Sequence, residues 1–96
     1  MNRLEQLSQA VQENWKKSKM LEEQAQEYCK NKRFRIVKNV FYSGFQKNLK
    51  GRECVLKPCV NNGKLLFSCV IYNKRTKRID IDHKYYYPLS FYEEIK

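Results

Sequence analysis

Basic side chains with aromatic residues between them are the feature of this sequence best suited to chemistry with another molecule. Residues 30–79 contain fourteen Lys or Arg residues and one acid, Glu53, a net charge of +13, whereas the flanks 1–29 and 80–96 carry −1 and −2. Arg and Lys bind phosphate groups, and aromatic faces stack on unpaired bases. The pattern therefore predicts a polyanionic partner, either a nucleic acid or an acidic protein surface.

The basic residues form three clusters, in the ranges 30–38, 47–57 and 74–78. The aromatic residues among them that are candidates for stacking on bases are Phe41, Tyr42, Phe45 and Tyr72. On a small barrel, loops at one end lie together, so two clusters can form one surface; the alternative is that Lys-rich loops are only solvated. The residues that we expect to bind RNA or single-stranded DNA are Lys32, Arg33, Arg35, Tyr42, Phe45, Lys47, Lys50, Arg52, Arg75 and Arg78.

His83 is the single histidine, and histidine is the side chain that most often serves as a general acid or base. Together with the nearby tyrosines it leaves a small basic ribonuclease as a weaker alternative function. However, His83 shares the predicted strand face of Ile79 and Ile81, which favours a structural role. We therefore predict no catalytic residue and no enzymatic activity.

The four cysteines do not follow the spacing of a zinc site. Structural zinc sites usually combine two close pairs of cysteines on tight turns. Cys54 and Cys59 fall on opposite faces of one strand-like run, while Cys29 and Cys69 fall in a helix and an apolar strand. We predict free thiols, no metal and no cofactor. Because no apolar run approaches the roughly 20 residues that span a bilayer, the expected location is the cytoplasm, without membrane contact.

The tyrosine run Tyr85, Tyr86 and Tyr87 is the second unusual feature. Successive strand residues point to opposite faces, so at least one of the three should be exposed. Tyrosine is enriched at protein interfaces, and the acidic flanks make this a poor surface for phosphate. These tyrosines and Trp15 are the candidates for contact with a protein; alternatively, the tyrosines cover the open end of a small core.

Residues 2–30 contain no Gly or Pro and are rich in helix formers, so the sequence predicts a helical segment. Asn14 and Ser18 interrupt its apolar stripe, which favours either one long helix or two helices with a break near 16–19. The apolar positions at helical spacing are Leu4, Leu7, Val11, Leu21, Ala25 and Tyr28. We expect this stripe to lie on the protein's own sheet, and a homodimer through a coiled coil over 4–28 is the alternative.

The pattern then changes to strands. A strand is expected within 34–42, where β-branched and aromatic residues are frequent, followed by a basic loop over 43–51. The alternating run 53–60 predicts a second strand, and Pro58 requires an edge or a bulge there because it has no N–H to donate.

Turn residues separate the remaining strands. The run 61–63, Asn-Asn-Gly, predicts a tight hairpin, because Asn and Gly tolerate positive φ. The range 64–72 is apolar on both faces, as in a central strand, and 73–76 predicts the next turn. The range 79–83 alternates with a period of two residues, and 88–92 predicts either a short turn of helix or a final strand.

These elements predict a single α+β domain over 1–96, with a helical segment at 1–31 and a β-rich basic segment at 32–96. The antiparallel meander either rolls into an SH3-like barrel or lies open under the helix. Its order of strands and loops resembles SH3-like small barrels in general layout, without a family motif. The predicted function is non-enzymatic binding of RNA or single-stranded DNA. The alternative is a protein-interaction module, such as a small phage or viral inhibitor or adaptor that docks on an acidic partner.

Overall fold

The N-terminal segment forms two helices that fold back on each other. The computed structural model describes residues 3–42, 47–73 and 75–95, and only the backbone of Tyr42 and Lys47. Helix α1 spans Arg3–Glu13 and α2 spans Ser18–Cys29, with a 3-10 turn at Trp15–Lys17 between them. The backbone of Asn14 is not helical (φ −143°, ψ 75°), and this ends α1. Of the two alternatives for this segment, the structure therefore has two helices, with the break starting at Asn14.

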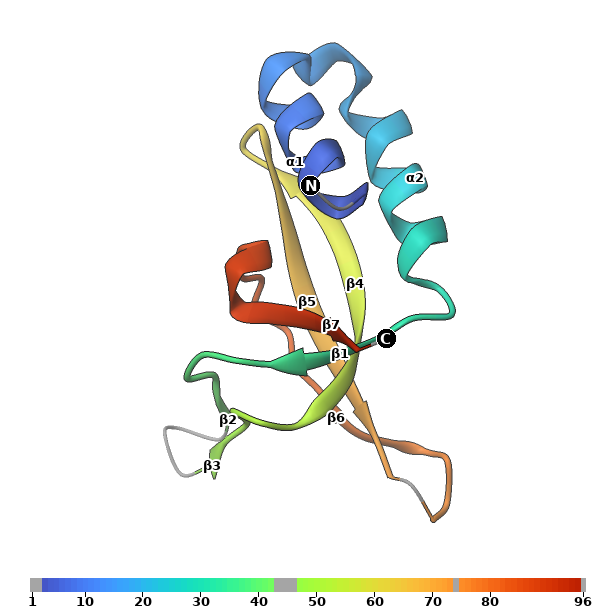
Figure 1. The fold of residues 1–96 in the computed structure, drawn as a ribbon, viewed down its shortest axis with the longest axis vertical. Coiled ribbons are helices and arrows are strands. Elements are labelled where there is room, and N and C mark those ends of the chain that lie inside the picture. The colour runs from blue at the N-terminus through green and yellow to red at the C-terminus, as the bar shows by residue number, and fades with distance from the viewer. Residues whose placement is uncertain (1–2, 43–46, 74, 96) are drawn as a thin grey trace.

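The apolar stripe of both helices is buried in the chain's own core. Figure 1 shows α1 and α2 side by side over one end of the sheet, where α1 contacts β5 (Lys64–Tyr72) and α2 contacts β4 (Glu53–Asn61). The helix residues in the core cluster are Leu4, Leu7, Val11, Leu21, Ala25 and Cys29. The face that a coiled-coil dimer would use is therefore already covered within the chain.

The described strands form an antiparallel sheet of five strands in the order β6-β5-β4-β1-β7. Its other strands are β1 (Arg33–Ile36), β6 (Ile79–Asp82) and β7 (Tyr92–Ile95). A separate two-stranded ladder joins β2 (Phe41–Tyr42) to β3 (Lys47–Asn48). The α+β class is confirmed. Since β6 and β7 are the two edges and no described pairing joins them, the sheet is open and the barrel is not confirmed.

The hairpin of β4 and β5 is the longest part of the sheet. Along β4 the side chains of Cys54, Leu56 and Pro58 are buried, while their neighbours are half-buried or exposed, as the alternating sequence predicted. Asn62 (φ 53°) and Gly63 (φ 74°) make a two-residue turn of the type that suits the right-handed twist of the strands. The predicted hairpin is confirmed.

Pro58 lies where β4 has a neighbouring strand on one side only. Strand β1 pairs with β4 only at Cys54 and Glu53, so beyond them β4 pairs with β5 alone, as the missing N–H of proline predicted. Helix α2 covers this open edge: the Glu22 carboxylate accepts a hydrogen bond from the Val60 N–H (2.7 Å), and Gln26 Nε2 donates to the Pro58 carbonyl (3.4 Å). The helices are thus attached to the sheet by polar bonds as well as apolar contacts.

The C-terminal part returns to the first strand. A 3-10 turn at Leu89–Phe91 leads into β7, which pairs along the whole of β1, so both forms predicted for 88–92 are present. The helices lie at one end of the molecule and the turn between β5 and β6 lies at the other (Figure 1). None of the helices in the described ranges is long and apolar enough to cross a membrane.

Candidate nucleic-acid interface

Strand β1 brings two of the predicted arginines to the surface of the sheet. Its side chains alternate, so Phe34 and Ile36 are buried in the core while Arg33 and Arg35 are exposed. Arg35 lies opposite Glu53 of β4, and Arg52 immediately precedes that strand. The first and second basic clusters of the sequence therefore meet where β1 and β4 pair.

Tyr72, the last residue of β5, is exposed and lies next to a bulge in β6. The register between β5 and β6 shifts after Ile71: Ile71 lies opposite Ile81, but Tyr72 lies opposite Ile79, which leaves Asp80 as the extra residue. Bulges commonly change the direction of a side chain at the end of a ladder. The Tyr72 side chain is 39% exposed, and the Arg33 guanidinium lies 6.0 Å from the centroid of its ring.

The side chain of Asn73 holds the turn after Tyr72 in place. Its Oδ1 accepts hydrogen bonds from the N–H groups of Arg75 (2.8 Å) and Thr76 (3.2 Å), and the Asn73 N–H donates to the Arg78 carbonyl (2.9 Å). Lys77, which donates its N–H to the Asn73 carbonyl, has a positive φ of 58°. Such local bonds between Asn and the backbone are the usual way in which a short turn is ordered. These bonds place the N–H groups of Arg75 and Thr76 around the Asn73 side chain.

Two adjoining grooves of about 600 and 550 Å³ lie around Tyr72, and Glu53, Tyr72 and Asn73 line both. We call these grooves, with Tyr72 and their basic residues, the Tyr72 surface. Its basic residues are Lys30, Arg33 and Lys77 in the first groove and Arg35, Arg52 and Arg75 in the second. Residues from all three basic clusters of the sequence are thus gathered on one surface.

Acidic residues neutralise part of this charge. Arg35 and Glu53 form an ion pair of 3.8 Å, and Arg52 and Asp80 form one of 3.7 Å, with all four side chains between 41% and 49% exposed. Exposed pairs of this kind stabilise a protein by about 1 kcal/mol at most, so a stronger anion can replace them. Since six basic residues face two acids in the grooves, the surface keeps an excess of positive charge.

The other residues predicted to bind nucleic acid do not line these grooves. The Lys32 ammonium lies over the ring of Tyr28 at 5.2 Å from its centroid, and Lys50 and Arg78 are exposed outside the grooves. For Tyr42 and Lys47 only the backbone is described, in β2 and β3, and Phe45 lies outside the described residues.

Tyr72 was predicted as a candidate for stacking on bases but was left out of the residues expected to bind nucleic acid, and Asn73 was not predicted as a site residue. The sequence places Tyr72 at the end of a run that is apolar on both faces, which is typical of a buried strand. The signal that could have identified it is the turn that follows, because the last residue of a strand before a basic turn often lies at the surface. The same turn residue, Asn73, could have been identified from its tendency to bond to the backbone two residues on.

The candidates for contact with a protein lie on separate elements. Trp15 is 69% exposed in the turn between the helices. Tyr85 and Tyr86 are 73% and 44% exposed, while Tyr87 is half-buried and pairs with Phe67 of β5. At least one tyrosine of the run is therefore exposed, as expected.

His83 is 3% exposed and bonds to the backbone through both ring nitrogens. The Tyr85 N–H donates to Nδ1 (3.3 Å), so Nε2 carries the hydrogen and donates to the Phe41 carbonyl (3.0 Å). An imidazole in this position joins the segment after β6 to β2. It would have to leave both partners to reach a substrate, which makes the ribonuclease alternative weaker.

The cysteines have the character of core residues. Burial raises the pKa of the Cys29 thiol to about 12, and the nearby Glu94 carboxylate adds to this effect. A hydrogen bond with Cys69, together with burial, raises the pKa of Cys54 above its usual range. These thiols stay protonated at neutral pH. In the described part of the chain, no three His, Cys, Asp or Glu side chains are arranged to hold a metal ion.

Comparison of the chain with protein-family models, with curated protein sequences and with solved structures finds no match. The functional reasoning therefore starts from the chemistry of the Tyr72 surface.

Proposed function

We propose that this protein is a small, non-enzymatic binding protein that contacts RNA or single-stranded DNA through the Tyr72 surface. The observation that carries the proposal is the convergence of Arg33, Arg52 and Arg75, from three separate segments, around one exposed aromatic ring. Guanidinium groups bind phosphates, and an exposed ring between them offers a stacking face, which is the combination found in proteins that bind single strands. The cytoplasm is part of the proposal, supported by the four free cysteines.

Fluorescence anisotropy with a labelled single-stranded RNA, repeated across a salt series, tests the proposal. We expect affinity to fall steeply with salt, because bound phosphates release their counterions. Lys77 lies in the first groove. Lys77→Gln should make the slope of log affinity against log salt concentration shallower by about 0.7, the value for one phosphate contact on a single strand. Lys19→Gln is the matched control, since Lys19 is exposed on α2 near the turn that joins the helices, away from the grooves.

Equal effects of the two substitutions would contradict the assignment of the surface. Failure to bind any single strand at low salt would contradict the function itself.

A second candidate function, docking on a partner protein, is favoured by the exposure of Tyr85 and Tyr86. The backbone before and after Tyr85 and Tyr86 is hydrogen-bonded to β5. The His83 N–H donates to the Cys69 carbonyl, and Tyr87 and Phe67 exchange two backbone hydrogen bonds. The two tyrosines between these points are held toward solvent on an ordered backbone. Tyr86→Ala should abolish capture of such a partner while leaving RNA affinity unchanged; loss of RNA affinity instead would contradict this candidate.

A further inference from the structure

Tyr72 is partly exposed beside two grooves that are lined by basic residues. The ring lies between the grooves, lines both of them and is 39% exposed. The Arg33 guanidinium, itself planar, lies 6.0 Å from the ring centroid and can extend a stack of aromatic rings. A flat apolar ligand with a negative charge attached to it would match this combination.

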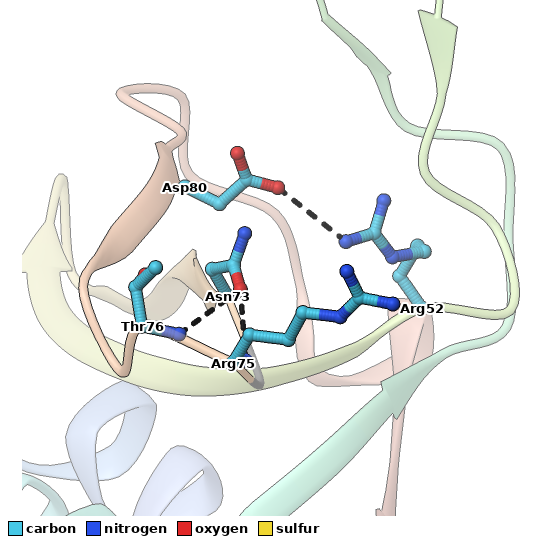
Figure 2. Close-up of polar contacts among 5 residues, drawn as sticks. All are labelled: Arg52, Asn73, Arg75, Thr76 and Asp80. Carbon is cyan, nitrogen blue, oxygen red and sulfur yellow. Dashed lines mark hydrogen bonds and ion pairs between the residues drawn. The ribbon is translucent and has the colours of Figure 1, made fainter.

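The second groove holds a pair of guanidinium groups next to Tyr72. Figure 2 shows the Arg75 side chain extending from its turn toward Arg52, so that both guanidinium groups face the same space. The Asn73 Oδ1 accepts a hydrogen bond from the Arg75 N–H at 2.8 Å, and Asp80 forms an ion pair with Arg52 at 3.7 Å. Two guanidinium groups offer the forked geometry that a phosphate accepts. The two carboxylates of this groove, Glu53 and Asp80, face three arginines, so the groove keeps a positive charge.

We propose that the Tyr72 surface binds an unpaired nucleic-acid strand, with one base stacked on Tyr72 and an adjacent phosphate held between Arg52 and Arg75. This inference rests on the proposed function and makes it more specific. In a duplex the faces of the bases are covered by neighbouring pairs, so the ring of Tyr72 can stack only on a base that is unpaired. A duplex can use the charge of the arginines but not the aromatic face.

The first experiment compares a single-stranded oligonucleotide with a duplex of the same length at one salt concentration. Wild-type protein should bind the single strand more tightly, and Tyr72→Leu should weaken that binding about 5- to 140-fold, the range for loss of one base stack. Duplex affinity should not change. Tyr72→Phe is the matched control, because it keeps the aromatic face and should keep the preference.

A single strand with abasic sites in place of its bases gives an independent measurement on the wild-type protein. Its affinity should fall to that of the duplex, and this result does not depend on the folding of any variant. Equal affinity of wild-type protein for the normal and abasic strands would overturn the stacking role of Tyr72.

The second experiment tests the phosphate position through Asp80. A phosphate on the far side of the Arg52 guanidinium would lie roughly 6–7 Å from the Asp80 carboxylate. At that distance in water, the repulsion between the two negative charges lowers the affinity for the phosphate about threefold. Asp80→Asn should therefore raise affinity about threefold at low salt. Asp82→Asn is the matched control, with the same change of charge at an ion pair of the same length, 3.7 Å to Lys57, outside both grooves. Equal effects would overturn the phosphate assignment.

The outcomes separate the two levels of the proposal. If single strand and duplex bind equally well, with a steep salt dependence and no effect of Tyr72→Leu, the basic surface binds nucleic acid but the base stack is wrong. If neither binds at low salt, the proposed function fails as a whole.

Discussion

Replacing Glu22 with Ala should weaken the attachment of the helices to the sheet. The Glu22 carboxylate accepts a hydrogen bond from the Val60 N–H at 2.7 Å, on the part of β4 that β1 does not cover. In the variant this half-buried N–H loses its partner within the protein. An unpaired backbone donor that is partly shielded from water is costly, so the folded state should lose stability.

The size of the effect follows from the character of the bond. Hydrogen bonds to charged groups contribute about 1.5–3 kcal/mol, and because Val60 is only half-buried, water can replace part of this contribution. We therefore expect the free energy of unfolding to fall by about 1–2 kcal/mol. In a domain of 96 residues, this corresponds to a decrease in Tm of about 5–15 °C.

Thermal and urea unfolding of Glu22→Ala and Glu23→Ala measure this loss. Glu23 is the adjacent, exposed residue of the same helix, so its substitution makes the same change in charge and in helix propensity. Only Glu22→Ala should lower the Tm and the urea midpoint substantially. If both variants unfold at the same temperature, the bond between α2 and the edge of β4 does not contribute and the reasoning is refuted.

Two further predictions concern the hairpin and the buried tyrosine. Gly63 has a φ of 74° with open space around it, so Gly63→Ala should cost about 1 kcal/mol through backbone strain alone, and Gly63→Asn should cost less; equal urea midpoints would contradict this. Burial raises the pKa of Tyr92 above its ordinary value of 10, and its hydroxyl donates to the Phe67 carbonyl at 3.0 Å. The unfolded chain therefore releases this proton first as the pH rises through 10, and stability falls. Urea unfolding between pH 8 and 11 should show a smaller loss of stability for Tyr92→Phe than for the wild-type protein. Identical pH profiles of stability for the two proteins would contradict the assignment.

Local patterns predicted most of the individual elements. The alternation along 53–60 identified which side chains of β4 are buried, and Asn62 and Gly63 marked the hairpin because few residues accept positive φ. Asn14 interrupted the apolar stripe where the helix ends. Each of these features depends on residues that are close in the sequence, so their types alone carry the information.

Contacts between distant segments could not be predicted in this way. The pairing of β7 with β1 joins the two ends of the β-rich segment, and nothing in either strand specifies the other. The polar bonds of α2 to the edge of β4 likewise depend on where the helices come to rest. Whether the sheet closes into a barrel is decided by such pairings, and here the edges stay apart.

The sequence by itself determined the kind of surface this protein presents, because the number and local grouping of its basic residues do not depend on folding. Only the tertiary structure decided which of them act together. Tyr72 is exposed at the end of β5, the pairing of β1 with β4 brings Arg35 beside Arg52, and the turn after β5 carries Arg75 to the same groove. The physical reason is that charge is a property of each residue, whereas a binding surface is a property of distances that are set by packing and strand register.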